Sequence, residues 1–71
     1  MDNLSNNAQK VYEAMKKLGA ISDNKLKTSD DIMKAAGLGK SMINAALQEL
    51  MDKKYVKRVA RQKSAGYYIF K

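Results

Sequence analysis

The chain has 71 residues and a formal net charge of +7, and it contains no cysteine, histidine or proline. This length allows one domain with a small core, and the lack of cysteine excludes disulfides and thiolate–zinc sites. No apolar run approaches the ~20 residues that a membrane span needs. Because Met1 leads into a polar segment rather than a signal peptide, we expect a cytoplasmic protein with a single domain over residues 1–71.

The positive charge is concentrated in the C-terminal part of the chain. Residues 1–39 carry six lysines and five acidic residues, whereas residues 40–71 carry eight lysines and arginines against only Glu49 and Asp52. Such a surface attracts a polyanion. Surplus lysine also keeps small proteins soluble, so composition alone leaves both interpretations open.

Apolar residues at three- and four-residue steps predict a first helix over residues 5–18. The residues of this apolar face are Leu4, Ala8, Val11, Tyr12, Met15 and Leu18. Ser5 is a suitable N-cap, and Gly19 suits the left-handed residue beyond the C-terminus. The connector that follows, residues 20–27, can form a short strand around Leu26.

A short second helix is predicted over residues 29–36. Thr28 is its N-cap. Together with Asp31, three residues later, it resembles a capping box in which aspartate replaces the usual glutamate. We assign Asp30 and Asp31 to the positive end of the helix dipole rather than to a metal site, because too few further ligands lie nearby.

Residues 37–39 read Gly-Leu-Gly and predict a turn between two helices. Gly37 can adopt a positive φ that ends the second helix, Leu38 would pack between the helices, and Gly39 can cap the next one. The third helix is then expected over residues 40–53.

The third helix has two faces of different chemistry. One is an apolar stripe of Ile43, Ala46, Leu47, Leu50 and Met51. The opposite face carries Lys40, Ser41, Asn44, Ala45, Gln48, Glu49 and Asp52. The cation and the amides come first and the acids last, which is the polarity expected if the N-terminal half of the helix lies against DNA.

The remaining residues predict a β-hairpin. Residues 55–61 and 67–71 are rich in valine and aromatic residues, and a loop over residues 62–66 joins them. We expect Tyr67 and Ile69 to face the core and Tyr68 and Phe70 to face outward, although a shift of one residue would reverse this.

The order and spacing of these elements resemble the winged helix-turn-helix family. The residues that carry the resemblance are Thr28, Ile32, Ala36-Gly37-Leu38, Ile43, Leu47, Leu50, Tyr55-Val56 and Gly66 to Ile69. The resemblance implies an α+β fold, a three-helix bundle with a C-terminal β-hairpin wing. The family usually has glycine where Lys54 stands, so we expect Lys54 to adopt a positive φ at a cost of about 1 kcal/mol.

The resemblance also implies a recognition helix at residues 40–53, a wing at residues 61–66 and double-stranded DNA as the partner. The implied base-edge contacts are Lys40, Ser41, Asn44 and Gln48. The implied backbone contacts are Arg58, Arg61 and Lys63. Either amide can form a bidentate pair with adenine, whereas the alternative interpretation of this surface is a solvated helix face.

We therefore favour a sequence-specific DNA-binding protein, most simply a small transcriptional regulator. An RNA-binding module, a protein-interaction module and a non-specific architectural DNA binder remain alternatives, because winged helices serve several roles. An enzyme is not expected, since histidine and cysteine are missing, and we expect no metal, cofactor or small-molecule ligand. One winged helix covers little DNA, which makes a homodimer possible.

Overall fold

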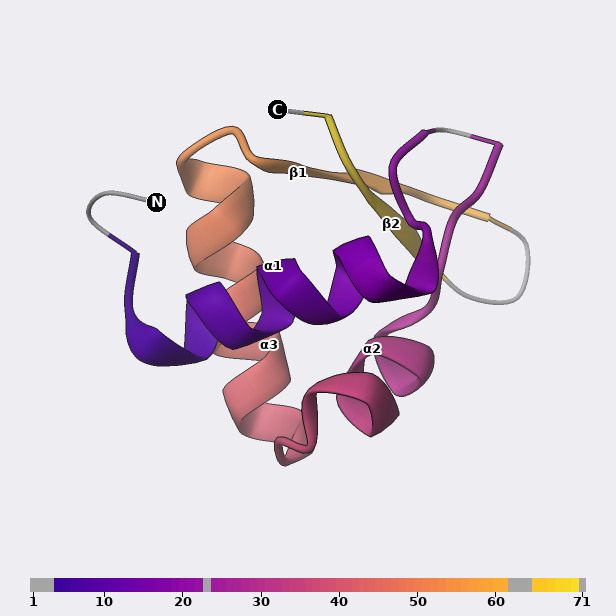
Figure 1. Cartoon of the computed structure of the whole chain (residues 1–71). Coiled ribbons are helices and arrows are strands. Elements are labelled where there is room, and N and C mark those ends of the chain that lie inside the picture. Colours follow the sequence, from indigo (N-terminus) through magenta and orange to yellow (C-terminus); the bar gives the residue numbers. More distant parts are fainter. Residues whose placement is uncertain (1–3, 23, 62–64, 71) are drawn as a thin grey trace.

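The computed structural model describes residues 4–22, 24–61 and 65–70. Its elements follow the order α1 (Asn6–Leu18), α2 (Ser29–Ala36), α3 (Lys40–Asp52), β1 (Val56–Val59) and β2 (Gly66–Ile69). Figure 1 shows α1 crossing in front of α3, α2 below α1, and the hairpin extending from the C-terminal end of α3 to the right, above α1. The predicted α+β architecture of three helices and a C-terminal hairpin is thus confirmed. Within the described ranges, none of the helices is long and apolar enough to cross a membrane.

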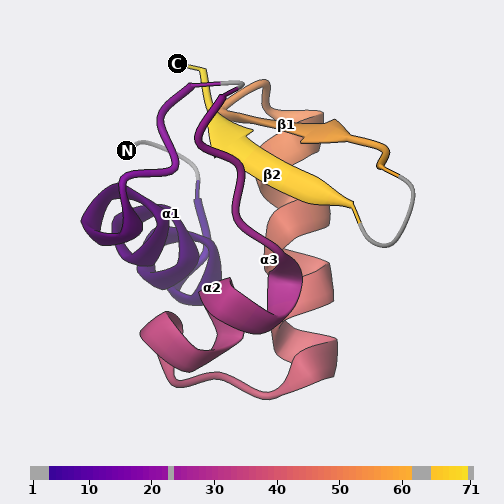
Figure 2. The same ribbon diagram turned by 90° about the vertical axis from the view of Figure 1, so that its right-hand side faces the viewer.

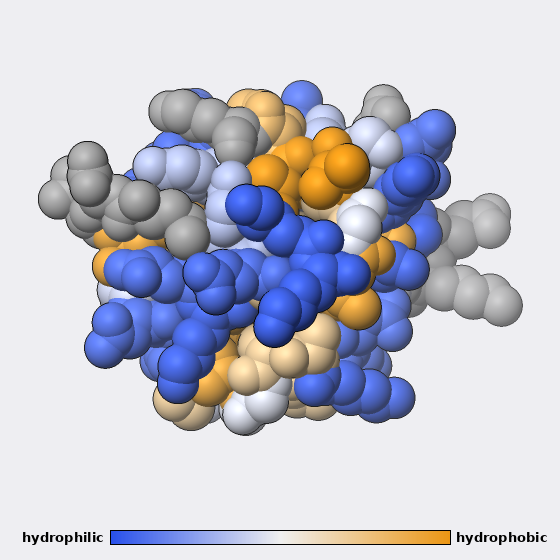
Figure 3. Space-filling model, viewed as in Figure 1, coloured by the Kyte–Doolittle hydropathy of each residue, from blue (hydrophilic) through white to orange (hydrophobic). Residues whose placement is uncertain are grey.

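The ends of α1 are capped as the sequence predicts. The Ser5 hydroxyl accepts a hydrogen bond from the Ala8 N–H at 3.2 Å, and Gly19 is left-handed with φ 77°. The helix buries Ala8, Val11, Ala14 and Met15. Its solvent side is polar, and Figure 3 shows hydrophilic residues across most of the face on which α1 lies.

The second helix begins with the predicted capping box. The Thr28 hydroxyl accepts from the Asp31 N–H at 3.2 Å, and the Asp31 carboxylate accepts from the Thr28 N–H at 3.4 Å. Gly37 ends the helix at φ 71°, and Gly39 is the N-cap of α3. Both glycine roles are confirmed, and Leu38 packs against the core.

The apolar stripe of α3 lies in the centre of the molecule. Ile43, Ala46, Leu47 and Leu50 are buried, and Met51 packs beside them. The helix ends at Asp52, one residue earlier than predicted. Apolar side chains from all three helices and both strands meet in this one cluster, which is what fixes the orientation of α3.

The end of α3 is a Schellman motif with lysine at the position usually taken by glycine. The N–H of Tyr55 donates to the Leu50 carbonyl at 2.9 Å, and that of Lys54 donates to the Met51 carbonyl at 3.1 Å. Lys54 has the expected positive φ of 68°. The motif turns the chain sharply from α3 into the hairpin.

The two strands of the hairpin are antiparallel and shorter than predicted. Their register pairs Val56 with Ile69 and Val59 with Gly66. Gly66 therefore begins β2 rather than ending the loop, because it pairs with β1 and is buried. Ile69 faces the core and Phe70 is 49% exposed, so the predicted orientation of the last strand is confirmed.

The connector between α1 and α2 lies beside β2, as Figure 2 shows. The sequence predicts a short strand around Leu26, but the structure has only an isolated antiparallel β-bridge there, between Lys27 and Tyr67. The N–H of Lys27 donates to the Tyr67 carbonyl at 3.2 Å, and the N–H of Tyr67 donates to the Lys27 carbonyl at 2.8 Å. The Ile69 N–H also donates to the Ala20 carbonyl at 2.8 Å. The connector is thereby fixed to the hairpin.

Candidate nucleic-acid interface

The exposed side of α3 carries the four side chains predicted to contact bases. Because the apolar stripe of α3 is buried, Lys40, Ser41, Asn44 and Gln48 are left exposed. At 3.6 residues per turn these four positions fall within an arc of roughly 100°. The helix therefore presents a cation, a hydroxyl and two amides together on one face.

The amide of Gln48 is oriented by a neighbour on the same helix. Its Nε2 donates to the Oδ1 of Asp52, one turn later, at 2.9 Å. A bidentate pair with adenine uses the amide oxygen and one of its two N–H groups. The bond to Asp52 occupies only one N–H, so the groups needed for adenine remain on Gln48. The i, i+4 spacing of an amide and a carboxylate is a sequence signal for this contact.

Glu49 does not belong to the outward face on which the sequence placed it. Its side chain turns to the beginning of α1, where Oε2 accepts from the Ser5 N–H and Oε1 from the Ser5 hydroxyl, both at 2.8 Å. These two hydrogen bonds, the backbone one foremost, lower the pKa of Glu49, and the positive charge of Lys53 adds to the effect. The contact ties α3 to α1 across 44 positions of the chain, a separation over which no sequence pattern indicates it.

The lowered pKa of Glu49 predicts an acid-sensitive contact. A carboxyl group whose pKa is lower in the folded than in the unfolded state stabilises the fold above the unfolded pKa, near 4.5. That stability is lost as pH falls from about 5 through the folded pKa. We expect Glu49→Gln to lose less stability than wild type between pH 6 and pH 3 in thermal melts. Glu13→Gln, a change at an exposed glutamate of α1, is the control; equal acid sensitivity in wild type and Glu49→Gln would contradict the prediction.

The hairpin region carries two of the three residues predicted to contact the DNA backbone. Arg58 in β1 and Arg61 just beyond it are exposed, whereas Lys63 lies outside the described residues. Figure 2 shows α3 and β1 on the same side of the molecule, with α1 on the other. The described site residues thus form a surface of two parts, the polar face of α3 and the basic hairpin. No group of three or more acidic residues in the described ranges is placed to hold a metal ion.

A three-helix bundle, a glycine turn between α2 and α3 and a C-terminal hairpin together define the winged helix-turn-helix fold. Comparison with solved structures shows the same fold. TubR from Bacillus megaterium pBM400 matches with a TM-score of 0.86 at 13% identity, over 97% of this chain and 77% of that chain.

A second similar structure is the solution structure of the DNA-binding TubR fragment from Clostridium botulinum. It matches with a TM-score of 0.77 at 21% identity, over 93% of this chain and 83% of that chain. No protein-family model matches the sequence, and a comparison with curated proteins finds no match. Likeness at these identities establishes the winged helix fold.

Proposed function

We propose that this chain is a sequence-specific double-stranded DNA-binding protein that regulates transcription, with α3 as its recognition helix and the hairpin as its wing. The observation that carries the proposal is the exposed face of α3, where Lys40, Ser41, Asn44 and Gln48 lie together beside a basic hairpin. The structural similarity to a protein described as a DNA-binding fragment supports it.

In this proposal α3 enters the major groove with its N-terminal half foremost. The groove is wide enough for an α-helix, and asparagine and glutamine recognise adenine through paired hydrogen bonds. Asn44 and Gln48 would read bases, while Lys40 and Ser41 lie in the first turn, where the helix dipole favours an anion. The acids of α3, Glu49 and Asp52, lie in its C-terminal half, away from the end that enters the groove, and both accept hydrogen bonds within the protein.

The hairpin contributes affinity rather than sequence information. Arg58, Arg61 and Lys63 would contact phosphates on the flanking backbone, and such contacts fix the register of a protein on DNA without distinguishing bases. A duplex-binding protein that neutralises about four phosphates should show a log–log salt slope of roughly −4.

The test is a salt-dependent binding titration against duplex DNA, single-stranded DNA and structured RNA of equal length. We expect the tightest binding to the duplex, with the steep salt slope given above. Stoichiometric titration counts the copies bound, and we expect two per preferred site because one winged helix covers little DNA. A slope near zero, or no binding at low salt, would eliminate the nucleic-acid function and favour a protein-interaction module.

Two alanine variants separate base reading from charge. Asn44→Ala should cost about 1–3 kcal/mol on a preferred site, selected from a random pool, and little on random DNA. Arg61→Ala should weaken both DNAs alike and make the salt slope shallower by about one. If both variants weaken both DNAs equally, α3 does not read bases, and the protein is a charge-driven architectural binder.

A further inference from the structure

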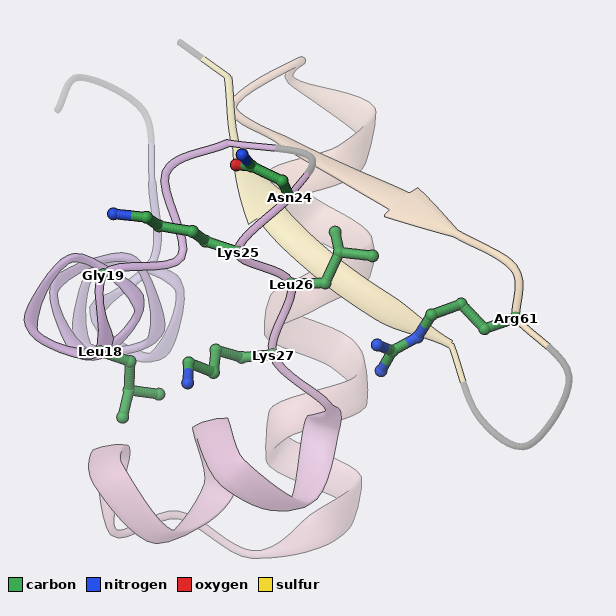
Figure 4. A pocket seen from close by; sticks show the side chains of 7 residues that line it. All are labelled: Leu18, Gly19, Asn24, Lys25, Leu26, Lys27 and Arg61. Carbon is green, nitrogen blue, oxygen red and sulfur yellow. The ribbon is translucent and has the colours of Figure 1, made fainter.

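An open hollow of about 520 Å³ lies between the C-terminal end of α1, the connector and Arg61, which stands just beyond the end of β1. Figure 4 shows the side chains that line it. Three of them are cationic, Lys25, Lys27 and Arg61, and Asn24 adds a polar amide. None of the described residues that line the hollow is acidic. Its chemistry therefore suits an anion.

The hollow brings the connector together with a residue of the wing. In Figure 4 the side chain of Arg61 extends from the end of β1 back toward the connector, where Lys25 and Lys27 originate. These two lysines belong to the nearly neutral part of the sequence, and neither the recognition helix nor the hairpin contains them. Only the fold places these lysines around the same hollow as Arg61, and in Figure 4 their ammonium groups point away from its guanidinium, so that the three charges are spread along one surface.

The connector lysines are held in place by the hairpin. The backbone of Lys27 exchanges two hydrogen bonds with Tyr67, and Leu26 packs directly on Gly66. On the other side, the Lys25 N–H donates to the Ser22 carbonyl at 3.0 Å. Because the backbone is fixed, a phosphate bound at this surface would lose little binding energy to ordering the chain.

We propose that Lys25 and Lys27, together with Arg61, form a phosphate-binding surface that extends the duplex contact beyond the recognition helix and the wing. This inference rests on the proposed function, since the DNA backbone is the source of phosphate that it names. The beginning of α2 follows Lys27 directly. Its acidic residue Asp31 borders a separate, neighbouring hollow with Lys27, and the Asp31 carboxylate accepts the Thr28 N–H of the capping box there.

The experiment compares two double variants that each remove two lysines. Lys25→Ala/Lys27→Ala changes the proposed surface, and Lys10→Ala/Lys17→Ala removes the same charge from the solvent side of α1. Each lysine–phosphate contact contributes about one to the salt slope. The connector variant should therefore have a slope shallower by about two and bind duplex roughly tenfold more weakly at low salt. Its base preference should not change, and thermal melts verify that both variants fold.

The proposed phosphate-binding surface is supported or overturned by the following outcomes. Equal losses of affinity and slope in the connector and α1 variants would overturn the proposal, because only overall charge would then count. If wild type binds no duplex, the proposed function fails, and titration with inorganic phosphate followed by amide NMR tests the surface separately. Saturable shifts at residues 25–27 that the connector variant lacks would support a site for free phosphate. No such shifts in wild type would overturn the phosphate surface as well.

Discussion

Leu47→Ala should destabilise the domain by on the order of 2–5 kcal/mol, the cost of removing a buried leucine and leaving a cavity. Leu47 is 1% exposed, at the centre of the cluster where α3 meets the other elements. A domain of this size has only about 4–10 kcal/mol of total stability. The variant should therefore melt at least about 10 °C lower than wild type, or not fold at all.

The control for this prediction keeps the volume of the side chain. Leu47→Met should cost less than about 1.5 kcal/mol, because methionine fills nearly the same space. Circular dichroism melts of the two variants and wild type measure the difference. A Leu47→Ala melting temperature close to that of wild type would mean that α3 is not oriented with this stripe in the core.

Gly66→Ser should clearly destabilise the hairpin and its contact with the connector. A Cβ at this position would lie 2.6 Å from the Leu26 Cβ and 2.9 Å from its Cδ1. The Leu26 Cβ is attached to a backbone that is bonded to β2 at the next residue, so it has little freedom to move. Overpacking of this kind costs about 1–3 kcal/mol, and here it would push the connector away from the hairpin.

The same substitution at another glycine provides a matched control. A Cβ at Gly39 meets nothing within 4 Å, and serine is a favourable N-cap for α3. Gly39→Ser should therefore leave stability unchanged or raise it slightly, whereas Gly66→Ser should lower the urea midpoint clearly. Similar midpoints for the two variants would show that the connector does not pack tightly on β2.

The sequence predicted the features whose causes lie within one turn or one strand. The bounds of α2, the capping box of Thr28 and Asp31, and the left-handed Gly19 and Gly37 were all confirmed. The positive φ of Lys54 followed from a family pattern and was confirmed too. These features depend on local hydrogen bonding, for which the necessary residues stand next to one another.

The candidate site was predictable to a similar extent. Helical periodicity was enough to place Lys40, Ser41, Asn44 and Gln48 on the exposed side of α3, since the apolar stripe must face inward. The same periodicity was wrong for Glu49. It placed this side chain on the outward face, whereas in the fold the carboxylate turns toward Ser5. The roles of these residues in reading bases and binding phosphates stay predictions.

By itself, then, the sequence determined the helices, their caps, the buried stripe of α3 and the inward and outward faces of the last strand. The tertiary structure alone decided the contacts between distant residues. These are the link from Glu49 to Ser5, the close approach of Gly66 to Leu26, and the gathering of Lys25, Lys27 and Arg61 around one hollow. The physical reason is that hydrogen-bond patterns and periodicity act along the chain, whereas such contacts depend on how whole elements pack, which no single segment encodes.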